Sequence, residues 1–217
     1  MGTFEQTAGD LVAAGRRFDA RGWVLGTSGN FSAVTARAPL RLAITRSGAH
    51  KGALQLDDIL EIDAAAASLR DGPGRPSAET LLHLEIVAAR GAGAVMHTHS
   101  IWSTLLSDRS AQDGGLAIEG YEMLKGLDGI ATHEHREWIP VLDNDQNIPR
   151  LAQAVRRVLD GHPACHGFLL RRHGLYTWGA TLPDAVRHVE ILEFLLESVG
   201  RARYSSTVSE EAAPWRS

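Results

Sequence analysis

The chain has 217 residues, of which 44 % are hydrophobic and 22 % charged, an ordinary globular composition that is sufficient for one large domain. Its formal net charge of -4 gives no electrostatic reason to bind nucleic acid. The single cysteine, Cys165, excludes an intramolecular disulfide and a cysteine-rich metal cluster, so any metal would need histidine and carboxylate ligands.

The N-terminal residues MGTFEQTAGD lack the basic start and apolar stretch of a secretory signal. No apolar run elsewhere approaches the roughly 20 residues that span a bilayer. We therefore expect a cytoplasmic protein with no membrane helix.

The first third of the chain predicts one helix followed by short strands. Apolar side chains at helical spacing, among them Leu11 and Phe18, predict a helix over 4–20 that ends near Gly22. Short apolar or alternating segments bounded by turn residues predict strands at 31–36, 40–46 and 58–62, and the stretch RDGPGRPS at 70–77 predicts a loop.

A helix and a strand follow this loop directly. Ser77 is placed as the N-cap of a helix through AETLLHLEIVAAR, which ends at Gly91 and Gly93. The strand VMHTHS at 95–100 comes next. The order helix, glycine, strand is typical of an α/β layer fold.

The last third predicts a helix over 149–160, two strands within FLLRRHGLYTWG that join near Gly174, and a long amphipathic helix over 183–200. No internal repeat or linker is present. We predict one α/β domain over residues 1–203, with three layers: a mixed, largely antiparallel central sheet and helices on both faces. Residues 204–217 are expected to form a loose polar tail.

Two histidines, His97 and His99, stand one residue apart in the apolar strand. Side chains alternate across a strand, so both rings project from one face and can share one ion. A catalytic zinc site usually takes three protein ligands. His173 is the best third candidate, because it lies where an apolar strand meets a glycine that allows close backbone approach. Hydrogen-bonded core histidines remain the alternative for this spacing.

A second pair with the same spacing, His133 and His135, lies among Thr, Glu and Arg in ATHEHREW. These neighbours are typical of a solvated loop. The second pair is therefore the weaker metal candidate.

Three turns ahead of the histidine strand could bind an anion. GTSGN at 26–30 and TRSGAHKG at 45–52 can direct backbone N–H groups at a phosphate, with Lys51 adding charge. Ser77 opens a helix whose free N–H groups favour negative ligands. Each could be an ordinary turn or cap, but together they favour a phosphorylated small substrate.

The ordered motifs SGN, SG, PSxE, HxH and RHG resemble the class II aldolase and adducin-like family over residues 5–200. Within it, the stretches PSAETLLH, HTHSIWSTLLS, EGYEMLKGL, THEHREWIPVLDNDQ and RRHGLYTWG are most similar to its sugar-phosphate dehydratases. The resemblance implies a class II aldolase-like fold, one zinc ion per subunit, and a homotetramer with sites near subunit interfaces.

Site residues follow from the same resemblance. It implies that His97, His99 and His173 bind zinc and that Glu122, in GYEMLKG, is the catalytic acid and base. Glu79, in PSAE, is expected to contact the substrate or support the metal ligands, with a plain first-turn helix acid as the alternative. The positions implied for phosphate binding are Gly29, Asn30, Ser47, Gly48, Lys51 and Ser77.

The implied reaction is the dehydration of a ketose 1-phosphate to a 2,3-diketone. Glu122 would take the C3 proton and return it to the departing C4 hydroxyl. Two alternatives stay open at this point. Aldol cleavage or epimerisation of a sugar phosphate could use the same scaffold, and an adducin-like binding domain would share the fold without the metal histidines.

Overall fold

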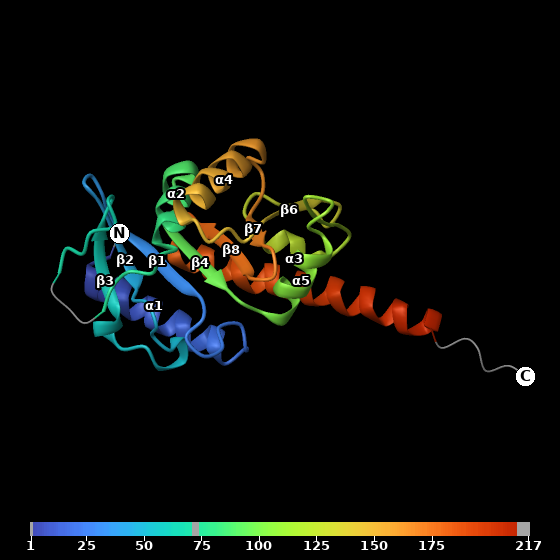
Figure 1. Cartoon of the computed structure of the whole chain (residues 1–217), viewed down its shortest axis with the longest axis horizontal. Coiled ribbons are helices and arrows are strands. Elements are labelled where there is room, and N and C mark those ends of the chain that lie inside the picture. Colours follow the sequence, from blue (N-terminus) through green and yellow to red (C-terminus); the bar gives the residue numbers. More distant parts are fainter. Residues whose placement is uncertain (1, 71–73, 212–217) are drawn as a thin grey trace, which may run out of the picture.

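The computed structural model describes residues 2–70 and 74–211, and the side chains of 2–70 and 74–204 (Figure 1). Within them, eight strands form one sheet in the order β3-β2-β1-β4-β8-β7-β6-β5. Neighbouring strands are antiparallel except β6 and β7. The strands are β1 (Asn30–Arg37), β2 (Leu40–Thr45), β3 (Ile59–Asp63), β4 (Ala94–Thr98), β5 (Gly115–Ile118), β6 (Glu137–Leu142), β7 (Gly167–Leu170) and β8 (Gly174–Gly179).

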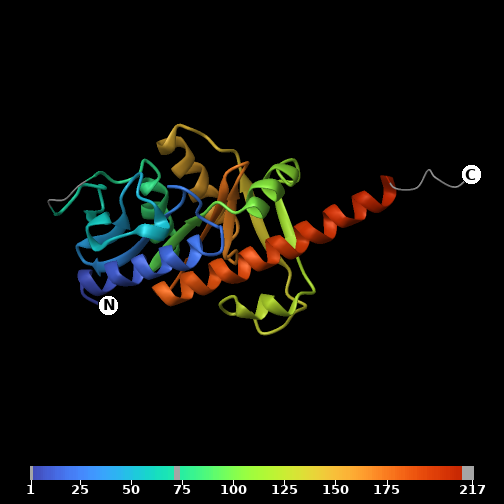
Figure 2. The ribbon, with the colours of Figure 1, turned by 90° about the horizontal axis from the view of Figure 1, so that it is seen from below.

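Helices cover both faces of this sheet, which confirms the predicted three-layer α/β fold (Figures 1 and 2). One face packs against α2 and α4, and the other against α1 and α5, with α3 beside α5. The helices are α1 (Phe4–Asp19), α2 (Thr80–Arg90), α3 (Ile101–Arg109), α4 (Ile148–Gly161) and α5 (Leu182–Glu211), with 3-10 turns η1 (Lys51–Ala53), η2 (Leu56–Asp58) and η3 (Glu122–Gly126).

The strand β4 shows how alternation assigns side chains to the two layers. Val95 belongs to the core under α2 and α4, whereas Met96 belongs to the core under α1 and α5. His97 therefore faces the α2 and α4 layer, and Thr98 faces α5. This strand carries the first candidate metal ligand between two packed layers.

The prediction that Ser77 caps α2 is wrong. The N-cap is Glu79, and the helix begins at Thr80. The Ser77 hydroxyl accepts the Glu79 N–H at 3.3 Å, and the Ser77 carbonyl accepts the Thr80 N–H at 3.0 Å. These bonds form a turn ahead of the helix, which is the local alternative that a serine side chain offers to capping.

The last helix is longer than the sequence indicates. α5 continues to Glu211, past Gly200 and into the expected loose tail, and its C-terminal part projects from the body (Figures 1 and 2). Gly200 does not end the helix; a Cβ there would lie 2.1 Å from the Trp102 ring, so the glycine serves close packing against α3. Residues 212–217 of that tail lie outside the described residues.

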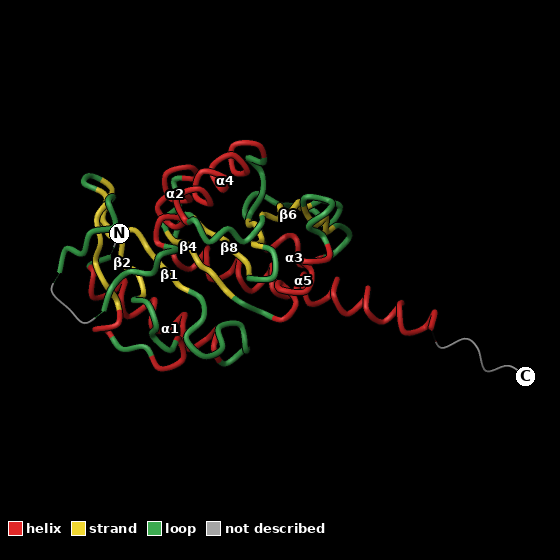
Figure 3. The backbone as a smooth tube through the Cα atoms, in the orientation of Figure 1, coloured by secondary structure: helices red, strands yellow, loops and turns green. Residues whose placement is uncertain are grey.

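The strands predicted at 31–36, 40–46 and 58–62 are confirmed as β1, β2 and β3, and every bound agrees within one residue (strands are yellow in Figure 3). Between residues 101 and 142 the structure contains α3, β5, η3 and β6, which the patterns above do not predict. Across the described residues, no helix combines the length and apolar character needed to cross a bilayer.

Candidate metal centre

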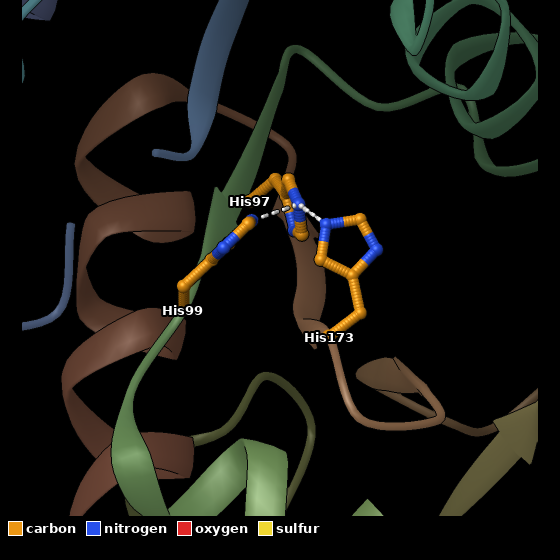
Figure 4. A group of neighbouring side chains, drawn as sticks. All are labelled: His97, His99 and His173. Atoms are coloured by element: carbon orange, nitrogen blue, oxygen red, sulfur yellow. Dashed lines mark hydrogen bonds between the residues drawn. The ribbon is translucent and has the colours of Figure 1, made fainter. Parts of the chain in front are cut away.

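Three histidines from two distant parts of the chain meet at one point (Figure 4). His97 lies on β4, His99 just beyond its end, and His173 in the turn between β7 and β8. The His97 Nε2 lies 2.8 Å from the His99 Nε2 and 3.3 Å from the His173 Nε2. In the described residues, these three form the one group whose ligand atoms, all within 4.8 Å of one another, could hold a metal ion.

Two glycines allow the segments to approach this closely. A Cβ at Gly174 would lie 2.0 Å from the Thr98 carbonyl oxygen, which confirms the expected close approach beside His173. Gly29 has a φ of +72°, and a Cβ there would lie 2.6 Å from the His97 carbonyl oxygen. Any larger residue at either position would push a strand away from the histidines.

Hydrogen bonds fix the tautomers of two of the rings. The Nδ1 of His97 donates to the Leu175 carbonyl at 2.9 Å, and the Nδ1 of His173 donates to the Asn144 Oδ1 at 3.2 Å. Both Nε2 atoms are then bare acceptors that face each other. In metal sites, hydrogen bonds of this kind to the second ring nitrogen orient the histidines that bind the ion.

Burial keeps all three rings neutral. It lowers the pKa of His99 to about 4, and it lowers the pKa of His97 well below the ordinary value and that of His173 in the same direction. The neighbouring rings add to this effect for His97 and His99. Neutral imidazoles carry the lone pairs that a divalent metal needs.

The donor set fits a divalent metal. Two nitrogens bound to one tetrahedral ion at about 2.0–2.1 Å stand about 3.3 Å apart. The His97 and His173 nitrogens have that separation. Two acceptor atoms at this distance repel unless a cation or proton lies between them, so a metal would satisfy the arrangement.

Glu79 supplies a carboxylate beside the histidines. Its Oε1 lies 3.4 Å from the His173 Nε2, and its Oε2 lies 3.9 Å from the His97 Nε2. The Asn30 Nδ2 donates to the Glu79 Oε2 at 2.6 Å. The side chains of Asn30 and Glu79, both candidate substrate-binding residues, are thus joined by a hydrogen bond.

Sequence reasoning missed Tyr176, which stacks on His97 with ring centroids 3.9 Å apart and planes 12° apart. Burial, and then the charge of Glu79, raise the pKa of Tyr176 well above its ordinary value. Tyr176 pairs with His97 across β4 and β8. If the pairing of β4 with β8 were known, the alternation of side chains on β8 would predict that Tyr176 lies beside His97.

Glu193 is the second residue that was missed. It lies on α5 and is 2 % exposed, and its Oε1 accepts the Thr98 hydroxyl at 2.6 Å. Thr98 stands between His97 and His99 and points to the opposite face. Glu193 therefore binds β4 on the sheet face opposite the His97 ring.

The candidate phosphate residues lie in neighbouring turns. Ser47, Ser77, Glu79 and His173 line one cavity of about 550 Å³. Gly48 lies in the same turn as Ser47 and has a φ of +74°, with open space where a Cβ would stand. The cavity connects two of the candidate phosphate-binding turns with the third histidine.

Lys51 belongs to the 45–52 turn and is buried beside the 26–30 turn. Its Nζ donates to the Thr27 carbonyl at 3.0 Å and to the Ala49 carbonyl at 2.7 Å. Burial lowers the pKa of Lys51 to about 8. Lys51 thus joins the 26–30 turn to the 45–52 turn.

The structure does not bring Glu122 to the histidines of the same chain. Glu122 opens η3, its side chain is 71 % exposed, and it pairs with Lys125, with His133 Nδ1 3.8 Å away. Leu124 of η3 packs in the core under α5, on the opposite side of the sheet from His97. Figure 2 shows the yellow-green η3 segment beyond α5.

Comparisons with known proteins agree with this architecture. Residues 9–199 match the model of the class II aldolase and adducin N-terminal domain. The chain is similar to proteins named methylthioribulose-1-phosphate dehydratase: 48 % identical over 196 residues in Pseudomonas fluorescens, covering 90 % of this chain and 92 % of that one, and 50 % identical over 195 residues in Methylococcus capsulatus, covering 89 % and 93 %.

Solved structures share the fold at lower identity. L-fuculose-1-phosphate aldolase from Thermus thermophilus superposes with a TM-score of 0.73 at 23 % identity, covering 97 % of this chain and 100 % of that one. YgbL from Escherichia coli superposes with a TM-score of 0.75 at 24 % identity, covering 90 % and 89 %. These likenesses establish the class II aldolase-like fold.

Proposed function

The chain belongs to the class II aldolase and adducin N-terminal domain family, and on that basis we propose that it dehydrates 5-methylthioribulose 1-phosphate to 2,3-diketo-5-methylthiopentyl 1-phosphate. This hydro-lyase reaction is a step of methionine salvage in the cytoplasm. The observation that carries the proposal is the convergence of His97, His99 and His173 in a chain about half identical to relatives with the dehydratase name.

The metal is zinc, one ion per subunit, held by the three histidines. Zinc prefers neutral imidazole nitrogen, and three protein ligands leave a coordination position open. A bound zinc ion would supply Lewis-acid stabilisation of negative charge on the substrate's carbonyl oxygen. Glu79, beside His173 and held by Asn30, contacts the substrate or steadies the ligands.

The acid and base is Glu122, provided by a second copy of the chain in a homotetramer. The support is geometric: η3 lies on the α5 side of the sheet, and the histidines face the α2 and α4 side. A carboxylate on an exposed turn is free to enter a neighbouring subunit's site. There it takes the proton from C3 of the substrate and returns it to the departing C4 hydroxyl.

The substrate phosphate binds at the turns in front of β4. Ser47 and Ser77 line the cavity that reaches His173, and Gly48 follows Ser47 in the same turn. Gly29 and Asn30 end the turn that packs on β4. Lys51 supplies positive charge behind both turns. The hydroxyl of Ser28 supports the proposal of an anion site here. In the described part of the chain this hydroxyl is buried with no hydrogen-bond partner, so it has a donor to offer.

The test combines metal analysis with a product assay. The purified chain should contain about one zinc ion per subunit and convert 5-methylthioribulose 1-phosphate to a diketone, detected by mass as the loss of one water. Parallel incubation with fuculose, rhamnulose and ribulose phosphates tests the aldolase and epimerase reactions. Triose phosphate or an epimer, with no diketone from the first substrate, would replace the dehydratase by one of these activities.

A further inference from the structure

A second group of ionisable side chains lies away from the three metal-binding histidines. Its centre is Glu137, the first residue of β6, which is 1 % exposed. The Glu137 Oε2 lies 2.8 Å from the His135 Nε2 and 3.0 Å from the His166 Nδ1. The Glu137 Oε1 accepts the backbone N–H of His166 at 2.9 Å. A buried carboxylate is thus held between two imidazoles.

Both ring nitrogens of His166 face acceptors. Nδ1 faces the Glu137 carboxylate, and Nε2 lies 2.8 Å from the Asp128 carbonyl oxygen. A ring that donates from both nitrogens is an imidazolium. Burial opposes this charge, but the hydrogen bond and charge of Glu137 outweigh it and raise the pKa of His166. With no lone pair free, this ring serves to hold its partners and not to bind a metal.

Two residues of α5, His188 and Arg187, also bind Asp128. The Asp128 N–H donates to the His188 Nε2 at 3.1 Å, and the His188 Nδ1 donates to the Trp178 carbonyl at 2.7 Å. His188 is 2 % exposed, and burial lowers its pKa, so the ring is neutral and its tautomer is set. The carboxylate of Asp128 also pairs with Arg187. Both backbone polar groups of Asp128 are therefore bound to the body of the domain.

Asp128 follows closely on η3, which carries Glu122. The segment 119–136 leaves the sheet after Ile118 and returns at Glu137, and these two residues are paired across β5 and β6. Within the segment only Leu124 and Leu127 are buried, both against the core under α5. Tyr121 and Ile130 also pack against this core. The polar bonds at Asp128 and His135 add further attachments between the segment and the body of the domain.

We propose that Glu137, His166 and His188 are positioning residues, which hold the segment 119–136 so that Glu122 is presented at a fixed place for the neighbouring site. This inference rests on the proposed function, in which Glu122 is the acid and base. The mechanism is rigidity: a carboxylate must lie within hydrogen-bond reach of the proton it removes, and an ångström of misplacement costs turnover.

The test uses His166→Asn, which can keep one of the two ring hydrogen bonds at most. Its matched control is His162→Asn, the same change at an exposed histidine four residues away. Hydrogen exchange of the amides of 119–134 should rise at least about tenfold in His166→Asn, as expected for the loss of one charge-assisted hydrogen bond. The kcat should fall by a similar factor, with KM and bound metal unchanged. His162→Asn should match the unmodified chain in all four quantities.

Unchanged exchange in 119–134 would overturn the inference, and so would raised exchange with unchanged kcat. Should His166→Asn not fold, Glu137→Gln, which keeps the shape and removes the charge, should give the same direction of change in exchange and kcat. A full kcat in Glu122→Gln would instead refute the role of Glu122. In that event exchange in His166→Asn still reports whether the three residues hold the segment.

Discussion

The ring of His83 holds the amide of Asn30. The His83 Nε2 lies in hydrogen-bond contact with the Asn30 Oδ1, and the His83 Nδ1 lies 2.8 Å from the Ser32 hydroxyl. Burial lowers the pKa of His83 to about 3, so the ring is neutral, donates from Nε2 and accepts from Ser32. The Asn30 amide must therefore turn its Nδ2 toward Glu79, whose carboxylate lies beside the His97 and His173 rings.

The hydrogen bonds that run from Ser32 through His83 and Asn30 to Glu79 form a relay. Replacing Asn30 by Asp tests it. The donor facing Glu79 would become a second carboxylate 2.6 Å away, and the two negative charges would repel each other. We expect turnover to fall at least about tenfold, since a charge-assisted hydrogen bond is lost and a repulsion added. Metal content, measured by elemental analysis, should stay close to that of the unmodified chain.

The matched control is Asn147→Asp, the same substitution at the N-cap of α4. Asn147 accepts the Arg150 N–H through its side-chain oxygen, and Asp caps a helix equally well. This variant should keep its turnover. Equal turnover in both variants would show that the orientation of Glu79 has no part in the reaction.

Loss of one candidate ligand should remove the metal. In His97→Ala the central nitrogen of the three is gone, because the His97 Nε2 contacts both other rings. We expect the purified variant to lack stoichiometric metal and to have no turnover above background. His133→Ala, in the rival pair, should retain its metal, because His133 lies outside the histidine group. A metal-loaded His97→Ala would exclude this centre.

Local patterns in the sequence predict the group of three histidines and most of the sheet. Strand alternation pairs His97 with His99, and the glycine after His173 marks that residue as the third candidate, because both signals act within a few residues. The relay from Ser32 to Glu79 could not be predicted in this way: His83 looks like one more residue of an amphipathic helix, and its partners are about 50 positions away. Contacts of that range are fixed by the fold.

Two residue types, a glycine and a serine, predict helix boundaries that the structure does not have. Gly200 is a helix-ending residue by type, but in α5 it makes room for Trp102. Ser77 is a capping residue by type, but its hydroxyl bonds within the preceding turn. In both cases tertiary packing or an equally good local bond decided between alternatives that the sequence alone leaves open.

The role of Glu122 can be tested by mixing variants. Glu122→Gln should lower turnover by about 10²–10⁴, the usual contribution of general acid and base catalysis, with metal retained. If Glu122 acts on a neighbouring subunit, co-expression of Glu122→Gln with His97→Ala should restore part of the activity in hybrid oligomers, since some sites then combine intact histidines with an intact carboxylate.

The control for this experiment is Glu119→Gln, an exposed acid on the same segment, which should keep full turnover. Hybrids as inactive as their parents, with mixed oligomers verified by mass, would contradict action between subunits. Full turnover in Glu122→Gln alone would remove this residue from the reaction.

The buried Glu193 should make stability depend on pH. Burial raises the pKa of its carboxyl to about 7, from an unfolded value of 4.5. Between these two values the folded chain binds more protons than the unfolded chain, so the free energy of unfolding falls as pH rises. Below pH 4.5 this carboxyl adds no penalty, and above pH 7 the penalty is complete, with an upper bound of roughly 3 kcal/mol.

Glu193→Gln removes this titration while keeping an oxygen that can accept the Thr98 hydroxyl. Relative to the unmodified chain, the variant should gain stability as pH rises from 5 to 8, measured by urea unfolding at each pH at matched metal content. The gain falls short of the upper bound, because the new amide N–H groups replace Oε2, which in the described part of the chain has no partner. A stability difference independent of pH would mean that Glu193 is ionised in the folded protein throughout this range.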